Sequence, residues 1–476
     1  MKTDSNHSDQ PQNWCPGVAW LRCACALLLV SFSSSLFAGQ PGVPAFPGAE
    51  GFGAVSVGGR QGRVIKVTNL NSSGPGSLQA AVSTEGPRIV VFDVAGVIRG
   101  DLEVPHSYLT IAGESAPSPG ITLVGRIVAR PVGGERLHDL VIRFLRIRQK
   151  PVLGHTGDVI QLPKSERFIL DHLSLSWGND ELLDIIHSSE VTVQWCTLEE
   201  SDPEGHDKGV GHNFALLSAY PDSGNISIHH NLFAHNARRN PSLTPYEPGK
   251  PADFRNNVVY NFKEGLGHDG HKPVEGINLV GNYYKRGPDA PWVDLYRFSP
   301  KGRYHLEGNW LEGVGLVNGA GDLSFLDSFR VRVNRLGELV DQPFAVVPVE
   351  TDDALTAYVR VLSQAGAFPR DRVTRRTVRE VISSTGIWRR NAPAAPSDAW
   401  FLSGLESASP VPDRDGDGLP DTWEVSRGYD PDRVDSNRLL PSGYTVIETY
   451  LHERARALLD RVTRHQSIEL AIERPE

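Results

Sequence analysis

Four segments in the middle of the chain share one pattern, which decides the fold: ISIHHNLF (226–233), DFRNNVVY (253–260), INLVGNYY (277–284) and YHLEGNWL (304–311). An asparagine takes the same place in each, and LVIRFLRI (140–147), FILDHLSL (168–175) and VTVQWCTL (191–198) fit the same frame. The aligned positions are Leu145, Leu173, Cys196, Asn231, Asn257, Asn282 and Asn309, which lie 28, 23, 35, 26, 25 and 27 residues apart. This period is typical of one coil of a parallel β-helix, in which each coil stacks on the previous one.

The four asparagines indicate how the coils are held together at a bend. A stacked Asn can hydrogen-bond the backbone of its own coil and of its neighbours, so we expect a structural ladder at these positions. We therefore predict an all-β fold, a single-stranded parallel β-helix. A β-sandwich is the alternative, but it fits the regular spacing with polar bends poorly.

Short helices are expected outside the coils. GPGSLQAAVS (74–83) predicts a capping helix that starts after Gly76, with Ser77 as its N-cap. Beyond about residue 320 the strand pattern fades. TDDALTAYVRVLSQAGA (351–367) and RTVREVISSTGI (376–387) then predict two helices that pack on the coils, and LHERARALLDRVTRHQ (451–466) predicts a terminal amphipathic helix.

The bulk composition narrows the class of partner. The chain has 476 residues with 47 Gly and 34 Pro, which favours a turn-rich β protein of one large domain plus a smaller part. Its net charge of -9 argues against nucleic acid as a partner. A polyanionic sugar would need local cations or bound calcium to be attracted.

The N-terminus carries the features of an export signal. The apolar run from Ala24 to Phe37 follows Arg22 and precedes a cleavage point at Ala38-Gly39, so we predict a signal peptide at 1–38 and secretion to the periplasm or the extracellular space. The run is too short for a comfortable membrane span, so no membrane association is expected after cleavage. The mature chain keeps only Cys196 and so cannot form an intrachain disulfide.

Acidic residues gather in FILDHLSLSWGNDELLDI (168–185), where Asp171, Asp180 and Asp184 would supply a cluster of hard oxygen ligands. Calcium takes six to eight oxygens in flexible geometry, so some can come from a substrate. Arg239 follows about one coil later, in Arg239-Asn240-Pro241. Calcium beside an arginine suits the removal of a proton next to a sugar carboxylate.

A second calcium signal lies in DRDGDGLPDTWE (413–424). It places acids at positions 1, 3, 5, 9 and 12 of an EF-hand-like loop, with Gly418 at position 6. The five acids are Asp413, Asp415, Asp417, Asp421 and Glu424. The loop resembles the calcium loops of thrombospondin type 3 or dockerin-like repeats, and we expect a structural calcium because no base lies nearby in the sequence.

Several motifs in a fixed order identify a family resemblance. PAFPGAEGFGA (44–54), SGPGSLQAAV (73–82), IVVFDVAGVI (89–98), LTIAGESAPSPGI (109–121) and the acidic segment resemble the pectate lyases of polysaccharide lyase family 1, over roughly residues 44 to 290. The resemblance implies a right-handed parallel β-helix with short capping and C-terminal helices. It also implies calcium-dependent β-elimination of polygalacturonate to unsaturated oligogalacturonides, with pectin as the partner and a monomeric enzyme.

The resemblance also implies roles for single residues. Asp171, Asp180 and Asp184 match the family's calcium ligands, Lys208 in HDKG resembles its substrate-binding lysine, and Arg239 takes the place of the arginine proposed as the base. The family commonly has a further Arg just after Arg-x-Pro, where this chain continues Ser242-Leu243-Thr244. Arg238 is our candidate for that second substrate-binding cation.

Other functions remain open at this point. A pectin lyase would act on methyl-esterified chains without needing the acid cluster, and a galacturonan hydrolase would need an acid and a base carboxylate across the scissile bond. A non-catalytic pectin-binding β-helix is the alternative from a different class. We expect the lyase domain at 39–320, a helical extension at 321–405 and the calcium-loop segment with the terminal helix at 406–476.

Overall fold

The structure is a computed structural model that describes residues 42–149, 157–204, 206, 212–267, 276–324, 326–334 and 337–472. Residues from Val43 onward group into one compact unit. The predicted signal peptide and Lys208 lie outside the described residues, so the structure does not address them.

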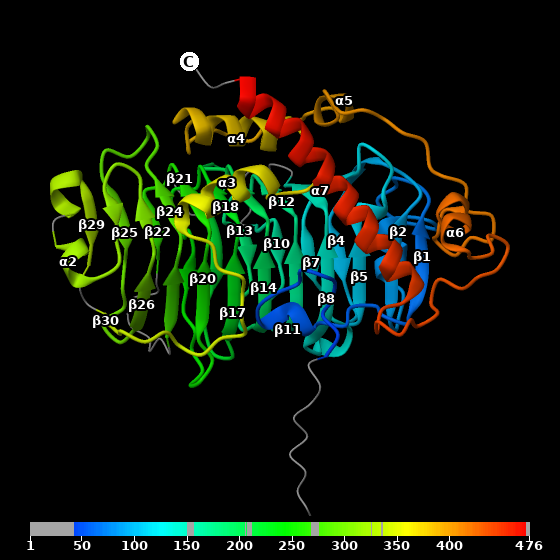
Figure 1. The fold of residues 1–476 in the computed structure, drawn as a ribbon, viewed down its shortest axis with the longest axis horizontal. Coiled ribbons are helices and arrows are strands. Elements are labelled where there is room, and N and C mark those ends of the chain that lie inside the picture. Colours follow the sequence, from blue (N-terminus) through cyan, green and yellow to red (C-terminus); the bar gives the residue numbers. More distant parts are fainter. Residues whose placement is uncertain are drawn as a thin grey trace, which may run out of the picture. The chain divides into compact units, whose positions relative to one another are not determined.

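The described strands wind into a parallel β-solenoid, which confirms the predicted fold (Figure 1). After β1, successive coils contribute strands to three faces, which we name sheet A, sheet B and sheet C, and sheet D continues sheet C. Sheet A contains β1 (Arg63–Val67), β2 (Arg88–Phe92), β5 (Leu109–Ala112), β8 (Leu137–Arg143), β11 (Ser165–Asp171), β14 (Ser189–Gln194), β17 (Gly224–His229), β20 (Ala252–Arg255), β23 (Ile277–Val280), β26 (Arg303–Glu307) and β30 (Glu338–Leu339).

Sheets B, C and D complete the coils. Sheet B contains β3 (Gly96–Arg99), β6 (Ile121–Val124), β9 (Leu145–Arg148), β12 (Ser174–Ser176), β15 (Thr197–Glu199), β18 (Leu232–Ala234), β21 (Val258–Tyr260), β24 (Tyr283–Lys285), β27 (Trp310–Leu311) and β28 (Gly315–Leu316). Sheet C contains β4 (Leu102–Val104), β7 (Ile127–Ala129), β10 (Ile160–Gln161), β13 (Glu181–Asp184), β16 (Phe214–Ser218) and β19 (Ser242–Leu243). Sheet D contains β22 (Glu264–Leu266), β25 (Val293–Tyr296) and β29 (Val331–Val333), so strands continue past residue 320.

Columns of stacked apolar side chains fill the interior of the solenoid. On sheet A one column passes from Leu140 through Phe168 and Val191 to Ile226, each the direct partner of the next. All four side chains are buried in the main core. Because parallel strands repeat at ~4.8 Å, each residue packs on its counterpart one coil away, and burial of this continuous core stabilises the stack.

The asparagine ladder is confirmed at the bend between sheets A and B. The amide oxygen of Asn257 accepts from the backbone N–H of Asn231 at 3.0 Å, and Asn282 does the same for the N–H of Asn257 at 2.9 Å. The amide oxygen of Asn309 accepts from the backbone N–H of Asn282 at 3.2 Å, and that of Asn231 accepts from the backbone N–H of Cys196 at 2.8 Å. Each ladder Asn also donates to a strand carbonyl, so the buried backbone groups of the bend are satisfied.

Helices lie at both ends of the solenoid and along its sides (Figure 1). The predicted N-cap is confirmed, because the Ser77 side chain accepts from the backbone of Ala80 at the start of α1. The helices are η1 (Phe52–Val55), α1 (Leu78–Val82), η2 (Gly113–Ser115), η3 (Val132–Gly134), α2 (Ala320–Leu323), η4 (Leu326–Phe329), α3 (Ala354–Gln364), α4 (Arg372–Ser383), α5 (Asp398–Phe401), α6 (Asp421–Arg427) and α7 (Val446–Ile472).

Helices α3 and α4 cover the outer face of sheet B. Val361 of α3 and Val381 of α4 are fully buried in one cluster with Leu232 and Val258, whose side chains point outward from β18 and β21. Figure 1 shows α3, α4 and α7 on the same side of the coils. Asp353 and Asp371 cap the N-termini of α3 and α4 by accepting from backbone N–H groups, which fixes where each helix begins.

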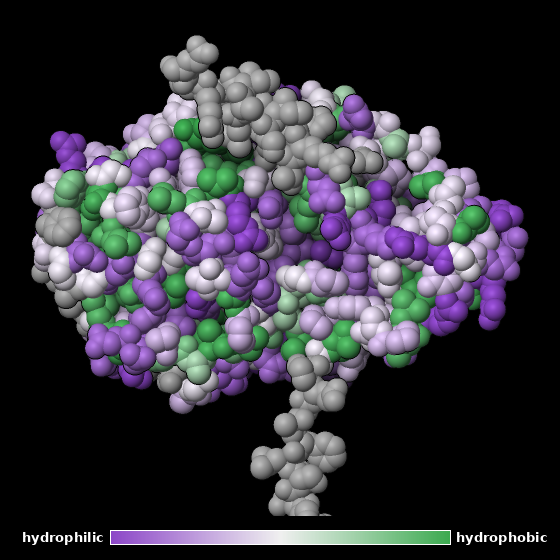
Figure 2. Space-filling model, in the orientation of Figure 1, coloured by the Kyte–Doolittle hydropathy of each residue, from purple (hydrophilic) through white to green (hydrophobic). Residues whose placement is uncertain are grey.

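The surface is mixed in character. On the face that Figure 2 presents, hydrophobic residues form small groups among hydrophilic ones. Within the described ranges, no helix combines the length and the apolar character needed to cross a membrane.

The asparagine ladder generates the first prediction. Asn257→Ala removes the acceptor used by the N–H of Asn231 and the donor used by the carbonyl of Ile228, both buried. We expect the free energy of unfolding to fall by about 3 kcal/mol, because two buried backbone groups lose their partners. Denaturant unfolding measures this, with Asn71→Ala at an exposed position as the matched control. Equal stability of the two variants would show that the ladder carries no energy.

Candidate active site

Parallel pairing on sheet C brings acidic residues from successive coils together. Ile160 and Gln161 of β10 lie beside Leu183 and Asp184 of β13. Asp158, two residues before Ile160, therefore reaches Glu181, whose backbone N–H donates to its carboxylate at 2.9 Å. Carboxylate oxygens of Asp158, Asp180 and Glu181 all lie within 4.8 Å of one another. We call these three residues together with Asp184 the sheet C acidic cluster.

Burial and mutual repulsion act on this cluster. Burial raises the pKa of Asp158, and the charge of Asp180 raises it further. The pKa of Asp184 is also raised, first by burial and then by the charge of Asp158. A cation among these oxygens would relieve the repulsion, and an all-oxygen set of this kind fits calcium.

Arg239 lies beside the acidic cluster. It sits in the loop between β18 and β19 in a left-handed backbone conformation, with φ of 56°. Its guanidinium pairs with Glu181 and lies 4.3 Å from the ring centroid of Phe214. The side chain remains 30% exposed, so a molecule bound over sheet C can reach it. The structure therefore brings Arg239, Asp180 and Asp184 together, as the sequence predicted.

Asp171 lies apart from this cluster, so its predicted place in the group was wrong. It ends β11 on sheet A and is fully buried. One carboxylate oxygen accepts from Arg143 at 2.8 Å and the other from Gln194 at 2.8 Å. Burial alone would raise the pKa of Asp171, but His172 and Arg143 hold it well below its usual range. Its oxygens are occupied by an internal ion pair.

Asp158 and Glu181 are the acids of this cluster that were not predicted from the sequence. The signal was present, because Gly-Asp at 157–158 precedes the apolar VIQL just as Asn-Asp-Glu at 179–181 precedes LLDI. The two segments align at the coil period. Of the other predicted residues, Arg238 is exposed and lies beside Phe214 through a backbone bridge. Lys208 falls on the part of the chain that is not described.

The C-terminal loop forms a second group of acids. Carboxylate oxygens of Asp413, Asp415 and Asp417 lie within 4.8 Å of one another, and so do those of Asp417, Glu424 and Asp435. Glu424 is fully buried, and within the described residues neither of its carboxylate oxygens has a hydrogen-bond partner. Burial raises its pKa to about 8, with the neighbouring aspartates adding to the shift.

Asp421 does not join that group, which corrects the predicted loop. Its two oxygens accept from the backbone and side chain of Arg414 at 2.9 and 3.0 Å. Asp435, from outside the predicted loop, joins the group instead, next to Asp417 and Glu424. Its backbone N–H donates to Asp417 at 3.0 Å, which fixes the two segments against each other.

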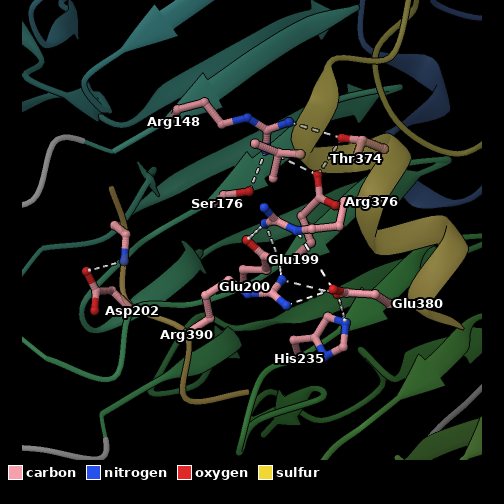
Figure 3. Close-up of polar contacts among 12 residues, drawn as sticks. Arg148, Ser176, Glu199, Glu200, Asp202, His235, Thr374, Arg376, Glu380 and Arg390 are labelled. Atoms are coloured by element: carbon pink, nitrogen blue, oxygen red, sulfur yellow. Dashed lines mark hydrogen bonds and ion pairs between the residues drawn. The ribbon is translucent and has the colours of Figure 1, made fainter. Parts of the chain in front are cut away.

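A buried polar network joins sheet B to α4 (Figure 3). Arg148 of β9 pairs with Glu199 at 3.1 Å and with Asp371, the N-cap of α4, at 2.8 Å. All three side chains are fully buried. This contact joins the solenoid to a helix that lies 223 residues away in the sequence.

The same network reaches the bends that lead from sheet B to sheet C. Glu380 of α4 pairs with His235 at 3.0 Å and with Arg390 at 2.7 Å, and Arg390 also pairs with Glu200 at 2.5 Å. Glu200 and His235 adopt left-handed backbone conformations at two neighbouring bends. His235 lies four residues before Arg239, so α4 holds the bend that carries this arginine.

Comparison with known proteins places the chain among related enzymes. It is 35% identical over 434 residues to a probable pectate lyase C of Aspergillus flavus, covering 89% of this chain and 95% of that protein. A probable pectate lyase C of Aspergillus terreus is 35% identical over 418 residues, 85% of this chain and 93% of that protein. No protein-family model matches the chain.

A solved structure shares the fold. The crystal structure of jun a 1, the major allergen from cedar pollen, superposes with a TM-score of 0.51 at 16% identity. It covers 67% of this chain and 92% of the allergen. At that identity the likeness concerns the solenoid alone.

The network under α4 generates a stability prediction. Arg148→Met leaves Glu199 and Asp371 as unpaired buried charges, so we expect the free energy of unfolding to fall by about 3–5 kcal/mol. Arg99→Met is the matched control, because Arg99 pairs with Asp398 in an exposed contact that also joins sheet B to the C-terminal segment. That variant should lose under about 1 kcal/mol. Equal losses, measured by denaturant unfolding, would contradict the role assigned to burial.

Proposed function

The chain belongs to the pectate lyase family and is a pectate lyase, and we propose that its active site is the sheet C acidic cluster together with Arg239. The observation that carries this assignment is the approach of Asp158, Asp180 and Glu181 to within 4.8 Å, with Arg239 paired to Glu181. We propose polygalacturonate as the substrate and β-elimination as the reaction, with unsaturated oligogalacturonides as products.

Calcium is the proposed cofactor at this site, held by Asp158, Asp180 and Asp184. The residues fit it, because oxygens of Asp158 and Asp180 lie within 4.8 Å of each other and the charges of both act on Asp184, which leaves further positions for substrate and water. Bound calcium would withdraw charge from the substrate carboxylate and so acidify the neighbouring C-5 proton. Asp171 has no part in this proposal, because its oxygens are engaged by Arg143 and Gln194.

Arg239 is the proposed proton acceptor. In elimination the C-5 proton leaves, its bonding electrons form the double bond between C-4 and C-5, and the glycosidic oxygen at C-4 departs with its electron pair. Arginine is ordinarily protonated, and Glu181 favours that form, whereas a divalent cation nearby favours the neutral one. We propose that Lys208 and Arg238 are substrate-binding cations, with Lys208 adding its charge at the carboxylate of the reacting unit.

The C-terminal loop is the proposed site of a structural calcium, held by Asp413, Asp415, Asp417 and Glu424 with Asp435. The buried, unpartnered carboxylate of Glu424 supports the proposal, since an uncompensated buried charge is costly. The loop is tied to the first coil, because Lys66 of β1 pairs with Asp413 at 2.8 Å and Leu419 packs on Ile89 and Val91. Calcium there would fasten the C-terminal segment to the start of the solenoid.

Secretion of the mature chain as a monomer completes the proposal. Its support is the predicted signal at 1–38, together with the single cysteine left after cleavage, Cys196, which is buried.

Activity on polygalacturonate tests the proposed site. We expect a calcium-dependent rise in the ultraviolet absorbance of the unsaturated product with wild-type protein and no rise with Arg239→Ala. Asp158→Asn should lose activity at limiting calcium, whereas Asp171→Asn should chiefly lose stability, because it breaks a buried ion pair. Reducing ends released without unsaturated product would indicate a hydrolase, and binding without turnover would indicate a pectin-binding protein.

Calcium affinity should rise with pH. Asp158 and Asp184 have raised pKa values, so they hold protons near neutral pH and must release them to bind the ion. Without calcium, the same shifts mean that stability falls as pH rises through the raised values. Calorimetry in buffers of different ionisation enthalpy measures the released protons.

Variants separate the two proposed calcium sites in that measurement. Asp158→Asn should remove the pH-dependent binding event at sheet C, and Glu424→Gln should remove the event at the C-terminal loop. A calcium affinity that stays constant from about pH 6 to about pH 9 would contradict the assignment of the carboxyls as ligands.

A further inference from the structure

One row of outward positions runs from the acidic cluster to the far end of the same face. Parallel pairing aligns Asp184 with Leu217, Leu217 with Ser242, and Ser242 with Gly267. Leu266 pairs with Tyr296, so the next place in the row after Gly267 belongs to Arg297. The backbone N–H of Arg297 donates to the carbonyl of Leu266 at 3.0 Å, which fixes this register.

Beyond Leu217, which is partly exposed, the row carries only small residues before Arg297. Ser242 is small and buried, and Gly267 has no side chain. Successive coils repeat at ~4.8 Å, so Arg297 lies two coils, or about 10 Å, beyond the coil of Arg239. A sugar chain that follows the solenoid axis from the coil of Arg239 would pass only Ser242 and Gly267 in this row before it meets Arg297.

Glu264 fixes the position of Arg297. Its carboxylate pairs with the guanidinium, and its side chain is only 8% exposed. The backbone of Glu264 is joined to the loop of Arg239, because its N–H donates to Ala237 at 2.9 Å and its carbonyl accepts from Asn240 at 2.9 Å. The Glu264 carboxylate lies close over Gly267, because a Cβ at position 267 would be only 2.6 Å from it.

Arg297 still has donors to offer. Its side chain is 49% exposed, and a guanidinium carries five N–H groups, so the bond to Glu264 leaves others directed outward. It borders a cavity of about 390 Å³ that Tyr296, Asp294 and Arg332 also line. Asp327 lines the cavity as well, and Arg332 pairs with Asp294 at 2.7 Å, so one of the two acids has a counter-charge.

We propose that Arg297 binds the carboxylate of a uronate unit of the substrate, two coils from Arg239, and gives the enzyme its preference for longer chains. The inference rests on the proposed function in one respect, namely that the polymer lies along sheet C. A planar guanidinium held by a buried carboxylate is well suited to a carboxylate ligand, because the two groups can form paired, charge-assisted hydrogen bonds.

A chain-length series tests this subsite. We expect kcat/KM of the wild-type enzyme to rise once oligogalacturonates become long enough to reach Arg297. Arg297→Gln should lower kcat/KM by about tenfold on those substrates, mainly through KM, and much less on the shortest cleavable ones. Arg297→Lys should recover part of the loss, since it keeps the charge without the paired geometry.

Arg303→Gln is the matched control. Arg303 is 50% exposed and pairs with Glu338 on sheet A, so its loss removes the same charge from a different face. Equal effects of the two variants, or an effect of Arg297→Gln that does not depend on chain length, would overturn the proposal.

The series also separates the two levels of inference. If wild-type protein cleaves no oligogalacturonate, the proposed function fails. The subsite can then be tested without cleavage, by comparing the affinities of wild type and Arg297→Gln for the same oligomers by calorimetry. Equal affinities on the longest oligomer would overturn it.

Discussion

Every feature of this protein depends on the stacking of parallel coils in strict register. A strand that slipped by one residue would turn its apolar side chains outward, so the core columns hold each coil in place. The same register makes neighbours of residues that lie 23 to 35 positions apart in the sequence. It aligns Asn231 with Asn257 inside the bend and Gln161 with Asp184 on the outer face. The ladder and the acidic cluster are therefore products of one constraint.

The bends between sheets impose a backbone cost that the solenoid must offset. Phe144, His172, Trp195 and His230 adopt φ between 51 and 56° at the same bend of successive coils. Left-handed conformations of such residues cost roughly 1 kcal/mol or more each. Stacked rings at these positions, such as Trp195 and His230 with centroids 4.3 Å apart, and the adjacent Asn ladder help to offset it. Fixed bends of this kind hold the loops that follow them in place, including the loop of Arg239.

The sequence predicts the parts of the structure that repeat, and it fails where contacts do not follow the repeat. The coil period and the asparagine ladder could be predicted because each coil shows them again. Asp171 was wrongly grouped with Asp180 and Asp184, because the sequence does not show on which sheet an acid at the end of a strand lies. The strand pairing of the structure places Asp171 on sheet A. Asp158 was missed because β10 has only two residues. The contact between Arg148 and Asp371 leaves no local pattern, since it forms when α4 docks.

The acidic cluster places charge where the fold alone does not neutralise it. Asp158, Asp180, Glu181 and Asp184 lie together on sheet C. Arg239 pairs with Glu181, His206 lies 3.4 Å from Asp180, and burial raises the pKa values of Asp158 and Asp184. Such an arrangement is unfavourable for folding, and natural proteins tolerate it mainly where function requires it. The buried network under α4 differs from the acidic cluster, because the charge of Arg148 is paired with the charges of Glu199 and Asp371. The row from Asp184 to Arg297 extends the surface of the acidic cluster in the direction in which the coils repeat.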